Sequence, residues 1–311
     1  MQSCLTRGCK NLEKLAVIIP CYNEEISIAN VIKDLKINLD AKIEYEIYVI
    51  DNNSTDLTSR VALENGAKII FEERVGKGFA VLTAFRKINA DYYILIDGDN
   101  TYDTTDINHV VKKLQEKETH VLVTRDHSED NSMTVRARLH LLGNKMITKL
   151  TNYFFGLNLE DSLSGYRGFS KGFVKTFTYN AKGFEIEAYL NLHSSILEIP
   201  VCCISSKYRD RQIGSFSKLR TIKDGLRIVS FILKKQSEWN PGVGLLIIGI
   251  VVFLFNLIDK FIGGISYNSI ISDFNFTLLT FMAVSLLALG LILKRFSDMK
   301  RKLIKIKFLE Y

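Results

Sequence analysis

The chain of 311 residues has few cysteines and histidines, the residues that form disulfide-stabilised folds and histidine-based active sites. Its five cysteines include no Cys-x-x-Cys pair, and the odd count is most simply explained by reduced thiols in a cytosolic compartment. None of the five histidines falls in a His-Glu-x-x-His motif or at the spacing of a catalytic triad. With three prolines and 47% hydrophobic residues, the composition also excludes collagenous and disordered chains.

Net charge is nearly absent from the first two thirds of the chain. Residues 1–217 hold 27 Lys and Arg against 28 Asp and Glu, whereas residues 218–311 hold 14 against 6. The basic excess therefore coincides with the long apolar runs of the C-terminal third. Anionic headgroups attract basic residues beside a membrane span, so this pairing indicates a lipid bilayer as partner and argues against nucleic acid.

Two runs of 20 residues without a charge, 239–258 and 274–293, each have the length of a transmembrane helix. Basic clusters flank both runs on the outside. The positive-inside rule then predicts a multi-pass membrane protein whose basic tail, residues 294–311, lies in the cytoplasm. A buried hairpin in the core of a soluble protein is the alternative interpretation.

Apolar residues recur at helical spacing over residues 218–238, which predicts an amphipathic juxtamembrane helix before the first run. Residues 1–14 contain no apolar stretch, so we expect an N-terminal extension without a signal peptide. The domain between them, residues 15–217, is accordingly expected in the cytoplasm. The sequence predicts no particular oligomeric state.

Residues 15–217 alternate between strand-like and helix-like segments. This alternation predicts an α/β domain with a mostly parallel sheet that is covered by helices on both faces. Ligands of such sheets bind at the carboxyl ends of the strands, where the polar clusters of this chain fall. The expected strands are 15–19, 46–50, 68–71 and 92–96, and the expected helices include 28–35, 54–64 and 78–88.

Acidic residues follow two of the expected strands. Asp97 and Asp99 flank a glycine directly after residues 92–96. Two such carboxylates suit Mg²⁺ or Mn²⁺, which prefers oxygen ligands and takes further ones from substrate phosphates; a solvated turn is the alternative. Asp51 follows the second expected strand and is expected to accept hydrogen bonds from a ribose or base, to form an Asx turn, or both.

Three further clusters carry polar chemistry. Gly76-Lys77-Gly78 opens a helix and suits a phosphate, although it lacks the spacing of a Walker A loop. Residues 161–167 combine a carboxylate, hydroxyls and a cation, and residues 183–187 carry two glutamates that cannot face the same way on a helix. A loop at 214–217 is either a phosphate-binding segment or a solvated surface loop, and it lies among Arg209, Arg211 and Lys218.

In this order, the clusters resemble those of the family 2 glycosyltransferases, specifically the polyprenyl-phosphate group typified by dolichyl-phosphate mannose synthase. The resemblance implies a GT-A fold and an inverting, metal-dependent hexosyltransferase that moves a sugar from a UDP- or GDP-sugar to a polyprenyl phosphate. The matching stretches cover most of residues 15–220: VIIPCYNEE (17–25), VIDNNSTD (49–56), GKG (76–78), LIDGDNTYD (95–103), DSLSGYRGF (161–169), GFEIE (183–187) and RQIGSFSKL (211–219).

The resemblance also implies roles for individual residues. Asp97 and Asp99 would hold the metal and the donor diphosphate, and they form the expected catalytic set with Asp161 and Arg211. The nucleotide sugar would be bound by Pro20, Tyr22, Glu24, Asp51, Lys77 and Asp97. The phosphates of the acceptor or donor would be met by Arg125, Arg138, Arg211 and Lys218.

The chemistry of the acceptor predicts the character of its site. A lipid phosphate has a second pKa of about 6 and is mostly dianionic at neutral pH, so it needs cations more than a catalytic base. Asp161 is the candidate base if one exists, and we expect instead that it orients an arginine or the metal shell. The cations that could hold the acceptor are Arg125, Arg136, Arg138, Arg211 and Lys218.

Two positions depart from the family pattern. Dolichyl-phosphate mannose synthases carry a metal-binding Gln two residues after the second aspartate, where this chain has Thr101, which leaves the metal shell and the sugar open. Residues 236–239 lack the arginine of the QxxRW motif, which argues against polymer synthesis.

The alternative functions are transfer to a lipid hydroxyl or a lipid-linked oligosaccharide, a non-catalytic membrane scaffold, and a nucleotidyltransferase or phosphatase on another α/β fold.

Overall fold

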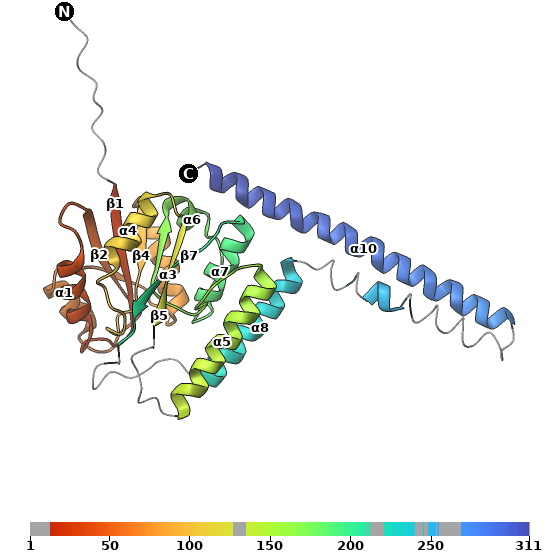
Figure 1. Cartoon of the computed structure of the whole chain (residues 1–311), viewed down its shortest axis with the longest axis horizontal. Coiled ribbons are helices and arrows are strands. Elements are labelled where there is room, and N and C mark those ends of the chain that lie inside the picture. The colour runs from red at the N-terminus through yellow and green to blue at the C-terminus, as the bar shows by residue number, and fades with distance from the viewer. Residues whose placement is uncertain are drawn as a thin grey trace, which may run out of the picture. The chain divides into compact units, whose positions relative to one another are not determined.

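The computed structural model describes residues 13–126, 135–209, 211, 221–239, 269–310 and a few positions between 245 and 254. It divides into two compact units, residues 1–229 with 307–311 and residues 230–306. The first unit contains a seven-stranded sheet with helices on both faces (Figure 1). The predicted α/β architecture is therefore confirmed.

The sheet has the order β3-β2-β1-β4-β6-β5-β7. Every strand runs parallel to its neighbours except β6, which is antiparallel to both β4 and β5. The carboxyl ends of the other strands therefore share one edge with the beginning of β6. The strands are β1 (Lys14–Cys21), β2 (Glu44–Asp51), β3 (Lys68–Phe71), β4 (Tyr92–Leu95), β5 (His120–Asp126), β6 (Arg167–Ser170) and β7 (Cys202–Lys207).

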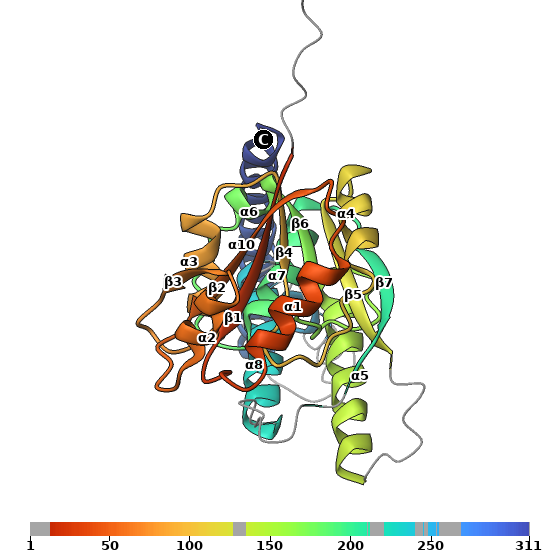
Figure 2. The ribbon, with the colours of Figure 1, turned by 90° about the vertical axis from the view of Figure 1, so that its left-hand side faces the viewer.

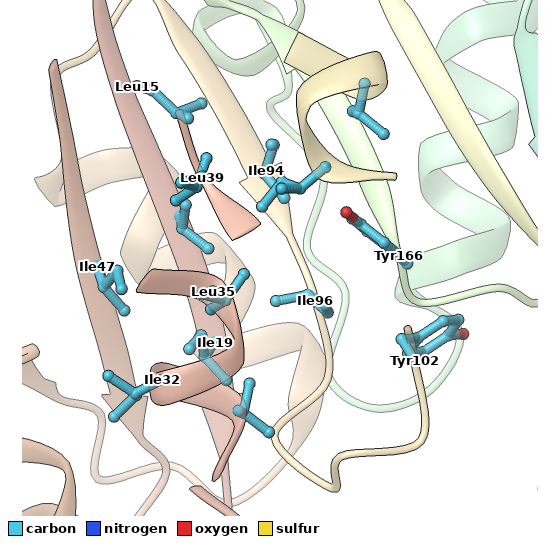
Figure 3. Packing of buried hydrophobic residues seen from close by; sticks show 14 of the residues in the cluster. Leu15, Ile19, Ile32, Leu35, Leu39, Ile47, Ile94, Ile96, Tyr102 and Tyr166 are labelled. Atoms are coloured by element: carbon cyan, nitrogen blue, oxygen red, sulfur yellow. The ribbon is translucent and has the colours of Figure 1, made fainter. Parts of the chain in front are cut away.

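Alternate residues of each strand pack against different helices. On one face, α1 and α4 cover the sheet, α4 over β5 and β6, with a cluster of buried and mostly aliphatic side chains that includes Ile19, Ile32 and Leu35 (Figure 3). On the other face, α3 contacts β1, α6 and α7 (Figure 2). The helices are α1 (Ile28–Asn38), α2 (Thr58–Glu64), α3 (Lys77–Lys87), α4 (Ile107–Gln115), α5 (Val135–Phe155), α6 (Lys171–Thr176), α7 (Ile186–Leu197), α8 (Thr221–Trp239) and α10 (Ser269–Leu309).

The C-terminal helix α10 contains 41 residues, about 60 Å at 1.5 Å per residue. Among the described residues, it holds the one stretch that is long and apolar enough to cross a membrane, Thr280–Leu309. Only 17% of its most apolar window is buried, whereas the core helix of a soluble protein is mostly buried. The predicted second span, 274–293, lies within α10, and the predicted basic tail continues the same helix. Most of the predicted first span, 239–258, lies outside the described residues, so the structure shows no hairpin.

The packing of α1 on the sheet makes a direct prediction about stability. Leu35 of α1 is fully buried, whereas Ile37 of the same helix is 78% exposed. We expect Leu35→Ala to lower the free energy of unfolding by about 2–5 kcal/mol, because it removes a buried side chain and leaves a cavity. Ile37→Ala is the matched control and should change it by no more than about 0.5 kcal/mol. Denaturant unfolding of the purified protein measures both, and equal effects would contradict this packing.

Candidate active site at the carboxyl edge of the sheet

The loops that leave the carboxyl edge of the sheet are tied to one another by buried hydrogen bonds. Ser27, in the loop after β1, donates its hydroxyl hydrogen to the backbone carbonyl of Gly98 at 2.7 Å. The backbone N–H of Asn52, after β2, donates to the carbonyl of Cys21 at 2.8 Å. The polar clusters after β1, β2 and β4 therefore form one connected surface.

The two aspartates after β4 have different partners. Asp99 is buried, and its Oδ1 accepts hydrogen bonds from the Thr101 hydroxyl at 2.6 Å and the Thr101 backbone N–H at 3.2 Å. Its Oδ2 lies 2.5 Å from Nη2 of Arg211. Asp97 pairs through Oδ1 with Nζ of Lys77 at 2.6 Å. Each carboxylate is thus neutralised by a cation from a distant part of the chain.

Two positions next to these aspartates, Gly98 and Gly165, have no room for a Cβ. A Cβ at Gly98 would lie 2.6 Å from Sγ of Cys21, and a Cβ at Gly165 would lie 2.4 Å from Oδ2 of Asp97. Real Cβ atoms do not approach so closely. The backbone at Gly165 therefore lies directly against the Asp97 carboxylate, and this contact brings the loop before β6 into the site.

Lys77, the first residue of α3, lies between two carboxylates. Its Nζ is 2.6 Å from Asp97 and 2.7 Å from Oε1 of Glu187 in the first turn of α7. Burial favours the neutral form of Lys77, but the two carboxylates outweigh burial and raise its pKa. Burial raises the pKa of Glu187, and Lys77 opposes that shift. Lys77 therefore stays charged between its two partners.

Asp51 forms the Asx turn that was one of its two predicted roles. Its Oδ1 accepts from the backbone N–H of Ser54 at 2.9 Å, and its Oδ2 accepts from the Ser59 hydroxyl. The helix α2 begins at Thr58, four residues after the predicted start at 54. Glu24 lies on the same side, buried, with its backbone N–H donating to the Thr58 hydroxyl at 2.8 Å.

Asp161, in the loop before β6, holds an arginine. Its carboxylate accepts hydrogen bonds from Nε of Arg125 at 2.6 Å and from Nη2 at 2.8 Å. Burial raises the pKa of Asp161, but the Arg125 guanidinium outweighs burial and holds it below its usual range. The same guanidinium lies over the ring of Tyr208, 5.6 Å from its centroid. The Asp161 carboxylate is therefore ionised at neutral pH and bound to Arg125 through both oxygens.

A fully buried arginine, Arg167, binds the backbone of the loop before β6. Arg167 donates hydrogen bonds to the backbone carbonyls of Ser164 and Ser162, each at 2.8 Å, and to Oδ1 of Asn191 at 2.7 Å. Nη1 of Arg167 also lies 3.3 Å from Nε2 of His120. These bonds fix the backbone whose Gly165 lies against Asp97.

The comparisons with known proteins agree with this geometry. The model of glycosyl transferase family 2 matches residues 16–177, more than half of the chain. The chain belongs to glycosyl transferase family 2. Three relatives from Haloferax volcanii are similar to it: glycosyltransferase AglJ, 31% identical over 74% of both chains; the low-salt glycan biosynthesis hexosyltransferase Agl6, 28% identical over 81% of this chain and 62% of that protein; and a dolichyl-phosphate hexose transferase, 24% identical over 71% of this chain and 93% of that one.

Solved structures place the fold among the GT-A-like α/β folds. Glucosyl-3-phosphoglycerate synthase from Mycobacterium tuberculosis, in complex with Mn²⁺, UDP-glucose and phosphoglyceric acid, superposes with a TM-score of 0.57. The two chains are 20% identical, and the match covers 72% of this chain and 80% of that one. The family membership makes this protein a nucleotide-sugar glycosyltransferase with an α/β domain of the expected kind.

The residues after β4 fit a divalent cation. Asp97 and Asp99 supply hard carboxylate oxygens, and Gly165 leaves space beside the Asp97 carboxylate that a Cβ would fill. Among the residues that the structure describes, no group of three or more His, Cys, Asp or Glu could hold a metal. A site with one or two carboxylates is the arrangement in which Mg²⁺ takes its other ligands from water and substrate phosphates.

The sequence analysis placed Arg167 and Glu187 in polar clusters but did not predict their partners. Glu187 pairs with Lys77 and Arg167 donates to Asn191, and both partners are remote in sequence. The side chains of Arg136 and Arg138 and the whole of Lys218 lie outside the described residues. Thr101, at the position of the family's Gln, hydrogen-bonds Asp99.

The Arg125–Asp161 pair predicts a pH-dependent stability. The side chains are 13% and 14% exposed, so Asp161→Asn should leave a buried cation uncompensated and cost about 3–5 kcal/mol at neutral pH. Because the folded-state pKa of Asp161 is lowered, the stabilisation is present above the unfolded value of about 3.9 and is lost as the pH falls through the folded value.

Denaturant unfolding of the wild type and Asp161→Asn from about pH 7 to about pH 3 measures this difference, which should shrink as the pH falls. The double variant Asp161→Asn/Arg125→Met is the matched control, since it removes both charges and should be less destabilised at neutral pH. A difference that stays constant across this range would contradict the assignment.

Proposed function

We propose that this protein transfers a hexose, with inversion, from a UDP- or GDP-sugar to a polyprenyl phosphate at the cytoplasmic face of a membrane. The observation that carries the proposal is the site after β4, where Asp97 and Asp99 each face a cation, Lys77 or Arg211, in a chain that also bears an exposed apolar helix. The dolichyl-phosphate hexose transferase of H. volcanii, by its name, acts on such an acceptor.

The donor is assigned to the loops after β1, β2 and β4. Pro20, Tyr22, Glu24 and Asp51 stand at the carboxyl ends of two adjacent strands, which is where nucleotides bind in open α/β sheets. Lys77 at the start of α3 brings a positive charge and the N-terminus of a helix toward the same edge, which suits the diphosphate. Asp97 completes this set.

Asp97 and Asp99 would hold a divalent ion, and that ion would supply Lewis-acid stabilisation of the departing diphosphate. Three residues of the chain contribute to the same stabilisation. Lys77 and Arg211 neutralise oxygens of the leaving group, and Thr101 keeps the Asp99 carboxylate in one orientation through its hydroxyl. The GT-A-like structural neighbour binds Mn²⁺ together with UDP-glucose, which supports Mn²⁺ or Mg²⁺ as the ion.

The acceptor phosphate needs positive charge more than proton transfer. At neutral pH its attacking oxygen is already ionised, because the second pKa of a phosphate monoester is about 6. The lowered pKa of Asp161 and its bidentate bond to Arg125 agree with a reaction without a carboxylate base. We assign Arg125, Arg136, Arg138 and Lys218 to the acceptor side, with Arg125 held in place by Asp161.

The exposed surface of α5 supports a membrane-bound acceptor. Leu142, Met146 and Tyr153 lie on one side of this helix at spacings of four and seven residues, and they are 65%, 57% and 81% exposed. Lys145 and Lys149 are exposed beside them. An apolar stripe with flanking lysines is the composition of a helix that lies at an anionic lipid surface. With α10 and the predicted span at 239–258 as anchors, this arrangement gives a multi-pass protein whose catalytic domain faces the cytoplasm.

The second candidate is transfer to a lipid hydroxyl or to a lipid-linked oligosaccharide. It is favoured by the match to Agl6, which is named as a glycan biosynthesis hexosyltransferase. A hydroxyl acceptor would need a general base, and Asp161 is bound to Arg125. The first candidate therefore has the better support.

The carboxylate after β4 gives the first test of this function. We expect Asp99→Asn to lower transfer of a radiolabelled sugar to membrane lipid by about 100-fold or more, because the developing charge on the diphosphate loses its stabilisation. Asp40→Asn, at an exposed aspartate in the loop between α1 and β2, is the matched control and should leave transfer unchanged. Full activity of Asp99→Asn, or full activity of the wild type in EDTA, would refute the proposed reaction.

The identity of the acceptor has a separate test. Membranes containing the protein should transfer sugar from one member of a panel of UDP- and GDP-sugars to added polyprenyl phosphate. A glycosyl phosphodiester should release the sugar in mild acid, whereas a glycolipid with an ordinary glycosidic bond should resist the same treatment. An acid-stable product would replace the first candidate by the second.

A further inference from the structure

The two cations that face the aspartates differ in how firmly they are held. Lys77 is anchored at the start of α3, is bound by Asp97 and by Glu187, and its side chain is 12% exposed. Arg211 lies beyond the end of β7, its side chain is 31% exposed, and Asp99 is its ion-pair partner within the part of the chain that the structure describes. Of the two, Arg211 is the cation that can leave its carboxylate at the smaller cost.

Arg211 occupies the oxygen of Asp99 that a metal ion would need. Oδ1 of Asp99 already accepts two hydrogen bonds from Thr101, so Oδ2 is the oxygen that remains for a cation. Nη2 of Arg211 lies 2.5 Å from this oxygen. A divalent ion also binds a carboxylate at close range, about 2.0–2.1 Å for Mg²⁺, so both cations cannot hold Oδ2 without strong repulsion.

A diphosphate offers Arg211 another anion. The planar guanidinium matches the oxygens of a phosphate in a bidentate arrangement and stays charged at any physiological pH. When Arg211 moves from Asp99 to a diphosphate, the repulsion at Oδ2 disappears and a new ion pair forms. Nucleotide binding and metal binding therefore favour each other.

We propose that Arg211 is an exchangeable counter-ion: it neutralises Asp99 in the metal-free protein and moves to the donor diphosphate when metal and nucleotide bind together. The metal then binds weakly alone and tightly with the nucleotide, and the same coupling factor applies in both directions. The assignment rests on the proposed function in one respect, that the donor is a nucleoside diphosphate sugar.

The test is Mn²⁺ binding to the full-length protein in detergent, measured as free Mn²⁺ by electron paramagnetic resonance, without nucleotide and with UDP or GDP. Arg211→Gln should bind Mn²⁺ about tenfold more tightly than the wild type without nucleotide, because a positive charge beside Asp99 is gone. The increase in Mn²⁺ affinity that the nucleotide produces should be about tenfold smaller in this variant. Samples of nucleotide without protein correct for Mn²⁺ bound in solution.

Two variants control for charge and for general effects on the loop. Arg209→Gln removes a neighbouring arginine that pairs with Asp34 and Asp103 and not with Asp99, so it should behave as the wild type. Arg211→Lys keeps the charge and loses the planar fork, so its Mn²⁺ affinity without nucleotide should stay close to that of the wild type.

The outcomes separate this inference from the function on which it rests. If UDP or GDP raises the Mn²⁺ affinity of the wild type but Arg211→Gln does not bind Mn²⁺ more tightly without nucleotide, the counter-ion role is refuted and the proposed donor stands. If neither nucleotide raises the Mn²⁺ affinity of the wild type, the exchange and the proposed donor class both fail.

Discussion

The site depends on the pairing of charges at the carboxyl edge of the sheet. Asp97, Asp99, Glu187 and Asp161 meet there; Asp99 and Glu187 are buried, Asp97 and Asp161 are partly buried, and taking these carboxylates out of water is costly without cations. Lys77 serves two of them, and Arg211 and Arg125 serve the others. Since these cations come from α3, from the segment after β7 and from β5, the charge pairs also fasten distant parts of the chain to one edge.

This arrangement needs backbone as much as side chains. Gly165 lies against the Asp97 carboxylate, and the carbonyls just before it are held by the guanidinium of Arg167. Burial lowers the pKa of Arg167. Its N–H groups donate to the carbonyls of Ser162 and Ser164 and to the amide of Asn191, so neutral acceptors stabilise the buried guanidinium. The support beneath the site is therefore a hydrogen-bond network, while the site itself is a set of ion pairs.

The sequence predicted the first half of the domain well, because its strands are continuous apolar runs followed by polar clusters. The expected strands at 15–19, 46–50, 68–71 and 92–96 coincide with β1 to β4. It did not predict β6, since Arg-Gly-Phe-Ser has no apolar run and becomes a strand only through its neighbours. Lys77 and Glu187 are 110 residues apart, so their pairing follows from the tertiary structure and from no local pattern. The roles of the site residues remain predictions, although the structure gathers many of them at one edge.

The reversed direction of β6 has a consequence for how this chain tolerates change. A parallel strand delivers to the carboxyl edge the segment that follows it, whereas β6 delivers the segment that precedes it. The ladders on both sides fix Arg167 opposite Leu95 and Leu122. An extra residue just before Arg167 would have to be absorbed by the segment or would turn the guanidinium to the opposite face. The stretch between Asp161 and Arg167 thus has a length dictated by the sheet, and variation among related chains should accumulate in other connections.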